Sequence, residues 1–183
     1  MTDILNLNIP TKITKIKSNF LDQKKVELFL KRDDLIHAII SGNKWRKLKY
    51  NLQAAKSKGY NTILSYGGPY SNHLHALSYT CDKMGFNSIG VVRNGKNHQN
   101  NPTLSFCISH QMTLYHIDRL SYRKYKYDPK LLEILKQKFG KFYVIPEGGN
   151  NLLGVKGCEE ILRESTINYD YVCAPVGTGC TAS

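Results

Sequence analysis

A cluster of basic residues stands where a helix pattern begins, in the segment SGNKWRKLKY over residues 41–50. Lys44 opens this pattern, and Arg46 and Lys47 lie within one turn of it. A helix N-terminus and neighbouring cations both disfavour an ammonium group, so we expect the Lys44 amine to be neutral more easily than an ordinary lysine. A neutral lysine can attack a carbonyl group and form a Schiff base. The plain alternative is a solvated basic helix face.

A second group of polar side chains follows a strand pattern, in SYGGPYSNHLHA over residues 65–76. Glycines and a proline turn the chain, and a helix pattern then begins with Ser71, Asn72 and His73. Ligands of open α/β sheets bind beyond the carboxyl ends of the strands, which is where this turn lies. The alternative is that Ser71 only caps the helix.

Two other chemistries are conceivable on the same helix, and the sequence favours neither. Ser71 and His75 lie four residues apart, as a nucleophile and its base could, but no G-x-S-x-G motif is present. A hydrolase is therefore not predicted. His73 and His75 point in different directions on a helix, which argues against a metal pair, and no metal site is predicted.

Glycine-rich turns end two further strand patterns. Residues 176–181, VGTGCT, offer backbone N–H groups and a threonine hydroxyl to a phosphate. The lysine of a Walker A motif is absent, so a nucleoside triphosphate is not predicted. The turn in IPEGGNNLLG, residues 145–154, is interpreted as a plain strand-to-helix connection. A Schiff-base lysine, a Ser-Asn-His turn and a phosphate loop together suggest pyridoxal phosphate, because its aldehyde takes the lysine and its phosphate takes the loop.

Alternating strand and helix patterns must position these groups. Strands are expected over residues 26–32, 61–66, 87–93, 113–118, 141–146 and 169–175, and helices over 43–59, 71–85, 102–112, 128–140 and 152–165. A loop is expected over 94–101, and residues 121–128 could be a short helix or a surface loop. This order predicts the α/β class, with a parallel sheet and helices on both faces.

The ends of two helices are marked by the residue types that usually begin and end helices. Ser71 is expected as an N-cap, and Gly85 as the glycine just past the end of the same helix. Asp128 and Pro129 are expected to begin the next-to-last helix, since proline is well tolerated in a first turn.

Composition limits the classes of function. The chain has 183 residues and a formal charge of +12, which would suit a phosphate-rich partner, but the lysines are spread along the whole chain. A nucleic-acid-binding module is therefore the weaker alternative, and no nucleic-acid partner is expected. No apolar run is long enough to cross a membrane, and the N-terminus does not resemble a secretory signal. Five scattered cysteines without a C-x-x-C pair suit a reducing cytoplasm.

Four motifs occur in order along the chain, namely KRDDL with SGNKWRKL, then GGPYSNHLHAL, IPEGGNN and PVGTGCTAS. Together they resemble the pyridoxal-phosphate enzymes of the 1-aminocyclopropane-1-carboxylate deaminase and D-cysteine desulfhydrase family. The resemblance runs from about Leu28 to the end of the chain. It implies a tryptophan-synthase-β-like two-domain fold, called fold type II, and a protein that is usually a homodimer.

The resemblance also implies how the chain is divided. Residues 48–158 would form the small α/β domain, and residues 1–47 with 159–183 would belong to the large cofactor-binding domain. Members of the family are longer than this chain, so the sequence looks truncated at its C-terminus and its large domain incomplete. Exposed apolar edges are therefore expected on the 169–175 strand.

By the same resemblance, the cofactor would be pyridoxal 5'-phosphate. Lys44 would be the Schiff-base lysine, and it would also move the α- or β-proton. Lys47 would lie near the phosphate, and Asn72 would hydrogen-bond the ring hydroxyl. The family usually has Gly or Ser where this chain has Cys180, whose side chain could crowd the phosphate. The phosphate cup would consist of Gly177, Thr178, Gly179 and Thr181.

The substrate residues that the resemblance implies lie in the Ser-Asn-His turn. Ser71 would contact the substrate carboxylate or act in ring opening, with Asn72 and His73 beside it. His73 resembles the desulfhydrase branch, which converts D-cysteine to pyruvate, sulfide and ammonia. The alternatives are a deaminase that converts 1-aminocyclopropane-1-carboxylate to 2-oxobutanoate and ammonia, or an inactive truncated homologue without cofactor. His75 stands where the family usually has Arg.

Overall fold

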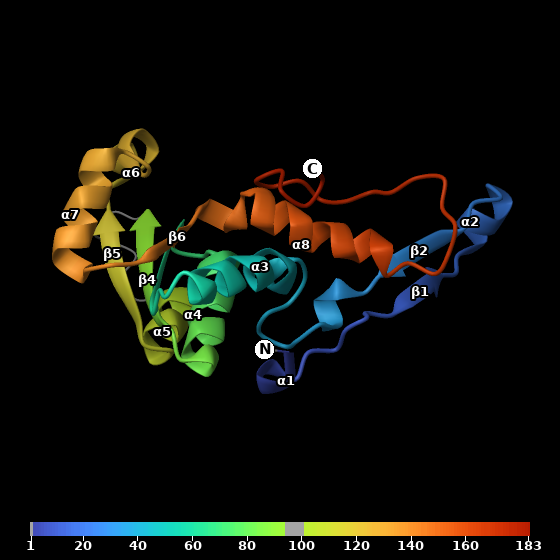
Figure 1. Cartoon of the computed structure of the whole chain (residues 1–183). Helices are drawn as coiled ribbons and strands as arrows, with labels where there is room; N and C mark the ends of the chain where they lie inside the picture. The colour runs from blue at the N-terminus through green and yellow to red at the C-terminus, as the bar shows by residue number, and fades with distance from the viewer. Residues whose placement is uncertain (1, 94–100) are drawn as a thin grey trace.

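The computed structural model describes residues 2–93 and 101–183 (Figure 1). The helices are α1 (Thr2–Leu5), α2 (Asn19–Gln23), α3 (Lys44–Ser57), α4 (Asn72–Met84), α5 (Pro102–Ser109), α6 (Arg119–Tyr125), α7 (Pro129–Phe139) and α8 (Leu152–Arg163). The strands are β1 (Ile13–Ile16), β2 (Leu28–Lys31), β3 (Thr62–Gly67), β4 (Asn87–Arg93), β5 (Met112–Ile117) and β6 (Tyr143–Ile145). Short 3-10 turns lie at Asp33–Leu35 (η1) and Glu147–Gly149 (η3).

Four parallel strands form the central sheet, in the order β5-β4-β3-β6. In its register, Ser65 of β3 lies opposite Gly90 of β4 and Ile145 of β6. Strands β3 and β4 are buried along nearly their whole length, as expected for parallel strands that helices cover on both faces. The predicted α/β class with a parallel sheet is therefore confirmed.

Helices pack on both faces of this sheet, and side chains that alternate along each strand separate two cores. Helices α3, α4 and α5 cover one face, where Ile63 of β3 joins their apolar side chains. Helices α6 and α7 cover the other face, where the next residue, Leu64, belongs to a core with Tyr122 and Leu135. Figure 1 shows α7 and the α4–α5 pair on opposite sides of the strands. The predicted two-sided cover is therefore confirmed.

Two helices begin and end where the sequence predicts. Ser71 caps α4 by accepting a hydrogen bond from the Leu74 backbone N–H, and Gly85 ends this helix with a left-handed φ of 72°. Asp128 caps α7, and Pro129 is its first residue. These ends depend on local geometry, which is why residue types alone could mark them.

Three further predicted segments have different outcomes in the structure. In the segment 121–128 that the sequence left open, residues 121–125 belong to α6 and residues 126–128 form the turn before α7. The loop expected over 94–101 lies outside the described residues, apart from Asn101, which caps α5. The strand expected over 26–32 forms as β2, but it pairs antiparallel with β1 in a separate two-stranded ribbon. It therefore does not join the parallel sheet.

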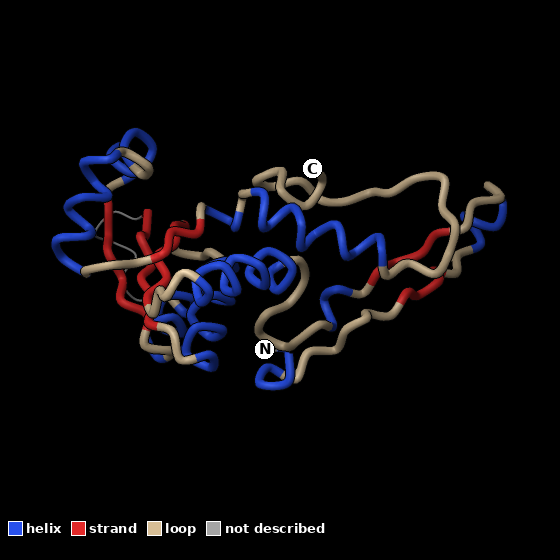
Figure 2. Tube along the Cα trace, viewed as in Figure 1, coloured by secondary structure: helices blue, strands red, loops and turns tan. Residues whose placement is uncertain are grey.

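The prediction of a strand over residues 169–175 is wrong. These residues form an irregular segment after α8 (Figure 2). Within it, Tyr171 is 89% and Val172 54% exposed. A strand needs a neighbour that satisfies its backbone N–H and C=O groups, and no described strand pairs with this segment. The exposed apolar side chains that were expected here do occur, but on a loop.

A buried ion network ties α8 to the N-terminal part of the chain. The Arg46 guanidinium on α3 is fully buried and bonds Asp33 of η1 at 3.2 Å and Glu164, just after α8, at 2.5 Å. Lys31 of β2 donates to the same Glu164 at 2.9 Å. Gly157 lets α8 approach α3 closely, because a Cβ there would lie 1.8 Å from the Arg46 carbonyl oxygen. These contacts hold the start of α3 in place.

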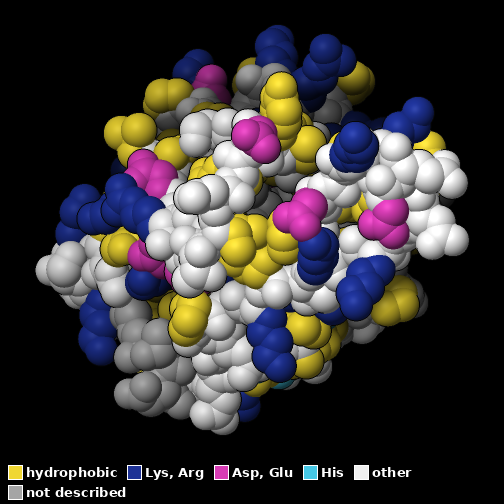
Figure 3. Space-filling view, turned by 90° about the vertical axis from the view of Figure 1, so that its right-hand side faces the viewer, with side chains coloured by type: hydrophobic (Ala, Val, Ile, Leu, Met, Phe, Trp, Pro, Cys, Tyr) yellow, Lys and Arg dark blue, Asp and Glu magenta, His cyan; other side chains and the backbone are white. Residues whose placement is uncertain are grey.

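The β1–β2 ribbon and α2 extend from one end of the molecule, where apolar side chains reach the surface between charged ones (Figures 1 and 3). Ile16 and Leu28 lie directly opposite each other, and both are exposed. Leu30, two residues further along β2, is exposed on the same face. Within the described ranges, no helix has both the length and the apolar character that a membrane span requires.

Candidate active site

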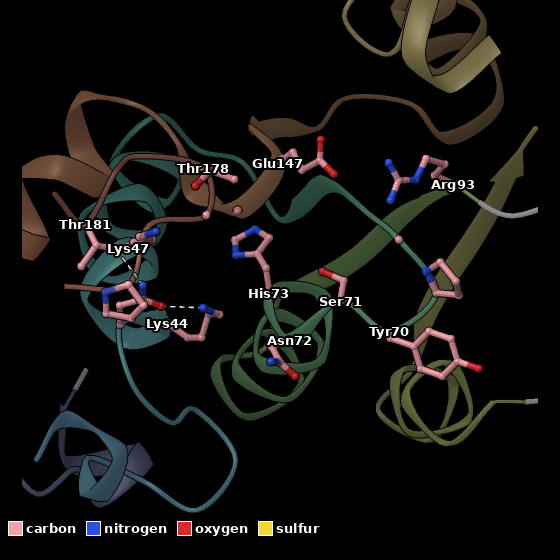
Figure 4. Close-up of a pocket in the computed structure, with 16 residues that line it drawn as sticks. Lys44, Lys47, Tyr70, Ser71, Asn72, His73, Arg93, Glu147, Thr178 and Thr181 are labelled. Carbon is pink, nitrogen blue, oxygen red and sulfur yellow. Dashed lines mark hydrogen bonds between the residues drawn. The ribbon is translucent and has the colours of Figure 1, made fainter. Parts of the chain in front are cut away.

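A cavity of about 480 Å³ lies beside the starts of α3 and α4, at the carboxyl end of β3. Five segments line it, namely the start of α3, the turn that leads into α4, the end of β4, η3 and the turn at residues 176–181, called here the C-terminal turn (Figure 4). The sequence predicted a ligand beyond the carboxyl ends of parallel strands, and this cavity occupies that position.

Lys44 is the first residue of α3, and it lines the cavity. Its Nζ donates to Asn43 Oδ1 at 2.5 Å, and the Asn43 amide donates to Thr181 Oγ1 at 2.7 Å, which joins α3 to the C-terminal turn. Burial lowers the pKa of Lys44, and the charge of Lys47 lowers it further. The direction agrees with the sequence prediction, but the larger cause, burial, comes from the tertiary structure.

Lys47, one turn along α3, is a cation with only 4% of its surface exposed, and it lines the same cavity. Among the residues that the structure describes, no carboxylate forms an ion pair with it. The acidic side chains Glu160 and Glu164 pair with Lys49 and Arg46 instead. Burying a charge without a partner is costly, so this part of the cavity favours an anion.

The C-terminal turn contributes three of the four residues predicted for a phosphate cup. Gly177, Thr178 and Thr181 line the cavity. Gly179 has a left-handed φ of 89°, which glycine adopts without strain, and it does not line the cavity. Its contribution is to turn the chain so that the two threonines can reach the cavity.

The Cys180 side chain does not crowd the cavity, so the crowding that the sequence suggested is wrong. The thiol is fully buried, and it donates to the Gly149 carbonyl oxygen at 3.4 Å. A Cβ on Gly154 would lie 3.0 Å from the same sulfur, which shows how closely α8 packs against it. The thiol therefore anchors the C-terminal turn from behind.

The Ser-Asn-His turn brings its three predicted residues to the same cavity. Ser71 both caps α4 and lines the cavity, so the plain alternative and the functional one are compatible. Asn72 is exposed, and Figure 4 shows it on the side of His73 that faces away from Thr178. His73 is almost fully buried, with its ring in the middle of the group.

His75 lies outside the cavity. Its ring stacks on Phe106 with 3.9 Å between the ring centroids. The Ser71 hydroxyl oxygen accepts from the Leu74 backbone N–H instead of pairing with this histidine. The Ser71 and His75 side chains therefore form no nucleophile pair, and His73 and His75 point apart as the sequence predicts.

Several residues that line the cavity were not predicted as site residues, among them Tyr70, Arg93, Glu147 and Gly148. Glu147 and Gly148 of η3 line the cavity, although their turn was interpreted as a plain connection. A Cβ on Gly148 would lie 2.9 Å from Thr178 Cγ2, so the double glycine of this turn was the available signal. Tyr70 and Arg93 also line the cavity. Tyr70 stands within the GGPYSNHLHAL motif but was given no role, and no sequence pattern singles out Arg93.

These residues together suit a ligand that carries an aldehyde and a phosphate. Lys44 supplies an amine whose pKa is lowered, and Lys47 supplies a buried charge that requires an anion. Thr178 and Thr181 supply hydroxyls, and a Cβ on Gly177 would meet no heavy atom within 4 Å. Pyridoxal phosphate has both groups, so the residues present fit this cofactor.

Comparison with known proteins gives the same assignment. Residues 4–183 match the family model described as pyridoxal-phosphate dependent enzyme. A putative 1-aminocyclopropane-1-carboxylate deaminase of Pyrococcus horikoshii is 33% identical over 159 residues, which are 85% of this chain and 49% of that protein. The mitochondrial bifunctional D-cysteine desulfhydrase/1-aminocyclopropane-1-carboxylate deaminase of Arabidopsis thaliana is 28% identical over 172 residues, 85% of this chain and 43% of that protein.

A solved structure has the same fold. The crystal structure of an ACC deaminase homologue matches with a TM-score of 0.80 and 28% identity, over 98% of this chain and 58% of that chain. The present chain spans about half the length of the curated relatives it matches. The resemblance read from the four motifs is thereby confirmed, together with the fold type that it implies. The chain belongs to the family of pyridoxal-phosphate dependent enzymes.

Proposed function

We propose that this chain forms the lysine-bearing part of an enzyme that uses pyridoxal phosphate to break down a small amino acid, with D-cysteine as the first substrate to test. The observation that carries the proposal is a convergence of three distant segments on one cavity. Lys44 from α3, Ser71 from the start of α4 and Thr178 from the C-terminal turn all line it. No local feature would bring these residues together by itself.

The two lysines would have separate tasks. When bound, pyridoxal phosphate supplies an electron sink that makes the Cα proton of an amino acid easier to remove. The lowered pKa of Lys44 leaves more of its amine neutral, and a neutral amine can attack an aldehyde and take a proton. Lys47 would bind the phosphate by charge, and Thr178 and Thr181 by their hydroxyls.

The substrate would bind at the start of α4. A helix N-terminus presents free backbone N–H groups and the positive end of its dipole, which together favour a carboxylate. We assign the substrate carboxylate to Ser71, with Asn72 on the ring hydroxyl of the cofactor and His73 beside the substrate. Both Ser71 and Asn72 lie at this terminus and line the cavity.

Two substrates are candidates for this site. D-Cysteine is supported by the histidine of the Ser-Asn-His turn and by the desulfhydrase activity in the name of the Arabidopsis relative. The second candidate is 1-aminocyclopropane-1-carboxylate, which is supported by the name of the Pyrococcus relative. Both reactions need a lysine that moves a proton, so the products distinguish them better than the site does.

The first experiment asks whether the chain binds the cofactor through Lys44. Purified protein is incubated with pyridoxal phosphate and reduced with borohydride, and the labelled peptide is identified by mass spectrometry. The wild type should carry the pyridoxyl mass on Lys44, and Lys44→Ala should carry none there. Lys56→Ala is the matched control, because this lysine is exposed on the same helix. Equal labelling of many surface lysines would refute the assignment.

The second experiment compares products. Sulfide and pyruvate released from D-cysteine, and not from L-cysteine, would support the desulfhydrase assignment. Release of 2-oxobutanoate from 1-aminocyclopropane-1-carboxylate would support the deaminase instead. A chain that carries the pyridoxyl label but releases neither product would support the cofactor assignment and contradict both candidate substrates for this chain.

Three further statements belong to the same proposal. We infer a small domain at residues 48–158, with residues 1–47 and 159–183 in a larger domain. We also infer a homodimer in the cytoplasm, on the resemblance and on the five thiols, none of which forms a disulfide. Sedimentation of the protein would test the dimer, and fractionation of its cells would test the compartment.

A further inference from the structure

Beneath the cavity, a buried serine and a buried histidine bond each other. Ser65 of β3 is fully buried, and its Oγ lies 2.9 Å from Nε2 of His73 on α4. The same Oγ lies 2.8 Å from the carbonyl oxygen of Ile145 on β6. Ser65 sits on the strand face that α4 covers, where its neighbour two residues earlier is the apolar Ile63. Serine is uncommon at a fully buried position of this kind, so we expect Ser65 to have a specific role there.

The bonding partners assign the hydrogens in this pair. The Ile145 carbonyl can only accept, so the single hydroxyl hydrogen of Ser65 goes to it. The Ser65 oxygen then accepts from His73, which places the hydrogen of the imidazole on Nε2. Burial, and then the charges of Lys44 and Lys47, lower the pKa of His73 to about 3, so the ring is neutral. Nδ1 therefore carries a lone pair.

This lone pair has no partner. His73 Nδ1 is buried, and no group in the described part of the chain donates to it. The His73 ring lines the cavity, and Figure 4 shows it between Lys44 and Lys47 on one side and Ser71 on the other. A buried acceptor that is left unpaired is unfavourable, so this position is suited to receive a donor from the cavity.

Lys44 can supply that donor. An ammonium group has three hydrogens, and Asn43 takes one of those of Lys44. We propose that Ser65 is a positioning residue that holds His73 as the Nε2–H tautomer, so that Nδ1 accepts a hydrogen bond from the Lys44 amine. In the present structure the Lys44 amine bonds Asn43 and not His73, so the proposed bond requires a rotation of the Lys44 side chain. The opposite tautomer would point an N–H at the lysine cations and repel them.

The unprotonated Nδ1 limits which chemical groups His73 can bind. A lone pair accepts N–H or O–H groups and repels a carboxylate, so His73 Nδ1 does not hold the carboxylate of a substrate. The substrate carboxylate is therefore proposed to bind at the start of α4. The role of the Lys44–His73 bond in catalysis rests on the proposed function. The His73 tautomer does not, because it is a property of the chain without cofactor.

NMR of the cofactor-free protein tests the tautomer directly. Two-bond ¹H–¹⁵N correlation spectra of protein labelled with ¹⁵N-histidine show which ring nitrogen is protonated, and His73→Gln identifies the signals of His73. The expected pattern is one protonated nitrogen at Nε2 and one unprotonated nitrogen at Nδ1. A protonated Nδ1, or a doubly protonated ring at neutral pH, would overturn the proposal.

Variants then test the role of Ser65. Ser65→Ala should lose the single tautomer, and Ser65→Thr should keep it because the hydroxyl is retained. Ser78→Ala is the matched control, since this serine is also buried but donates to the His75 carbonyl oxygen. A Ser65→Ala spectrum identical to that of the wild type would refute the positioning role.

Lys44→Ala tests the donor. The Nδ1 resonance of His73 should shift in this variant and should stay in place in Lys56→Ala. An Nδ1 resonance that does not move in Lys44→Ala would contradict the proposed bond. If Ser65→Ala does not fold, the wild-type and Lys44→Ala spectra still decide. Because no pyridoxal phosphate is added, a failure here is distinguishable from a failure of cofactor binding.

Discussion

Lys44 and Lys47 face one cavity from the same turn of α3, but their surroundings differ. Lys44 has an acceptor in Asn43, whereas Lys47 is buried and lacks an acidic partner among the described residues. The charge of Lys47 is one of the two causes that lower the pKa of Lys44. A pair of this kind suits a ligand that offers an aldehyde to one lysine and an anion to the other.

Lys47→Gln should raise the pKa of Lys44, because a like charge that disfavours the ammonium form is removed. The measurement is the pH dependence of borohydride-trapped labelling of Lys44 by pyridoxal, which lacks the phosphate and therefore does not need Lys47 for binding. The midpoint should move to higher pH. Lys56→Gln should leave it unchanged, and a midpoint that moves down in Lys47→Gln would contradict the assignment.

Glu164 is the residue on which the buried ion network depends. Burial opposes its ionisation, but hydrogen bonds from Arg46 and Lys31 and the charges of both residues outweigh burial and lower its pKa from 4.5 to about 2. A carboxyl with a lowered folded-state pKa stabilises the fold above its unfolded pKa, and this contribution is lost as the pH falls. The window is therefore between about pH 4.5 and 2.

Glu164→Gln should lower the free energy of unfolding at neutral pH by about 3 kcal/mol, because Arg46 loses a buried partner. It should also flatten the loss of stability between pH 4.5 and 2. Urea unfolding at several pH values measures both effects. The control is Glu159→Gln, whose ion pair with Arg163 is on the surface and should cost under about 1 kcal/mol. Equal losses in the two variants would exclude this account.

At the scale of elements, the approach of α8 to α3 decides where the start of α3 lies. Gly157 and Gly154 are the two glycines of α8 that face other backbone, and a Cβ on either would meet a carbonyl oxygen. Glycine is unfavourable inside a helix by about 1 kcal/mol relative to alanine. Close packing of α8 on α3 and η3 outweighs that cost here.

Gly157→Ala should therefore destabilise the protein, although the same change in an open helix would stabilise it. The added Cβ lies 1.8 Å from the Arg46 carbonyl oxygen, so the helices must separate, at a cost of roughly 3 kcal/mol. The control is Lys156→Ala, which is exposed at the preceding position and loses only a cation–π contact with Tyr50, so stability should change by less than about 1 kcal/mol. A stabilised Gly157→Ala, measured by urea unfolding, would show that the contact is absent in solution.

At the scale of the whole molecule, the two ends differ in how completely their strands are covered by other elements. The four-stranded sheet is covered by helices on both faces (Figure 1). The β1–β2 ribbon instead has an apolar face in solvent. Isolated two-stranded ribbons are only marginally stable in water, and an exposed apolar strand promotes association. The ribbon is therefore the part of the surface at which we expect the chain to associate.

Leu28→Lys combined with Leu30→Lys should reduce self-association, because both side chains are exposed on the apolar face of the ribbon. Light scattering over a range of protein concentrations measures the effect, and unfolding should change by less than about 1 kcal/mol. Leu120→Lys is the control, since Leu120 is exposed on α6 at the other end of the molecule. An equal effect of the control would indicate general charge repulsion.

Much of the fold could be predicted because it depends on neighbours along the chain. The helices α4 and α7 begin and end at the predicted residues, since a cap bonds a backbone group two or three residues away. Most strands also lie where apolar runs predict them. The pairing of β2 with β1 and the loop at 169–175 could not be predicted, because a strand exists only where another strand can bond it.

The sequence by itself determined the family, the order of the elements and the types of the site residues, since four motifs and the apolar periodicity carry that information. Only the tertiary structure decided which side chains meet. The bond from Asn43 to Thr181 joins residues 138 positions apart, and the bond from Cys180 to Gly149 turns a thiol away from the cavity. Burial is the largest cause that lowers the pKa of Lys44, and burial is a property of the packed chain.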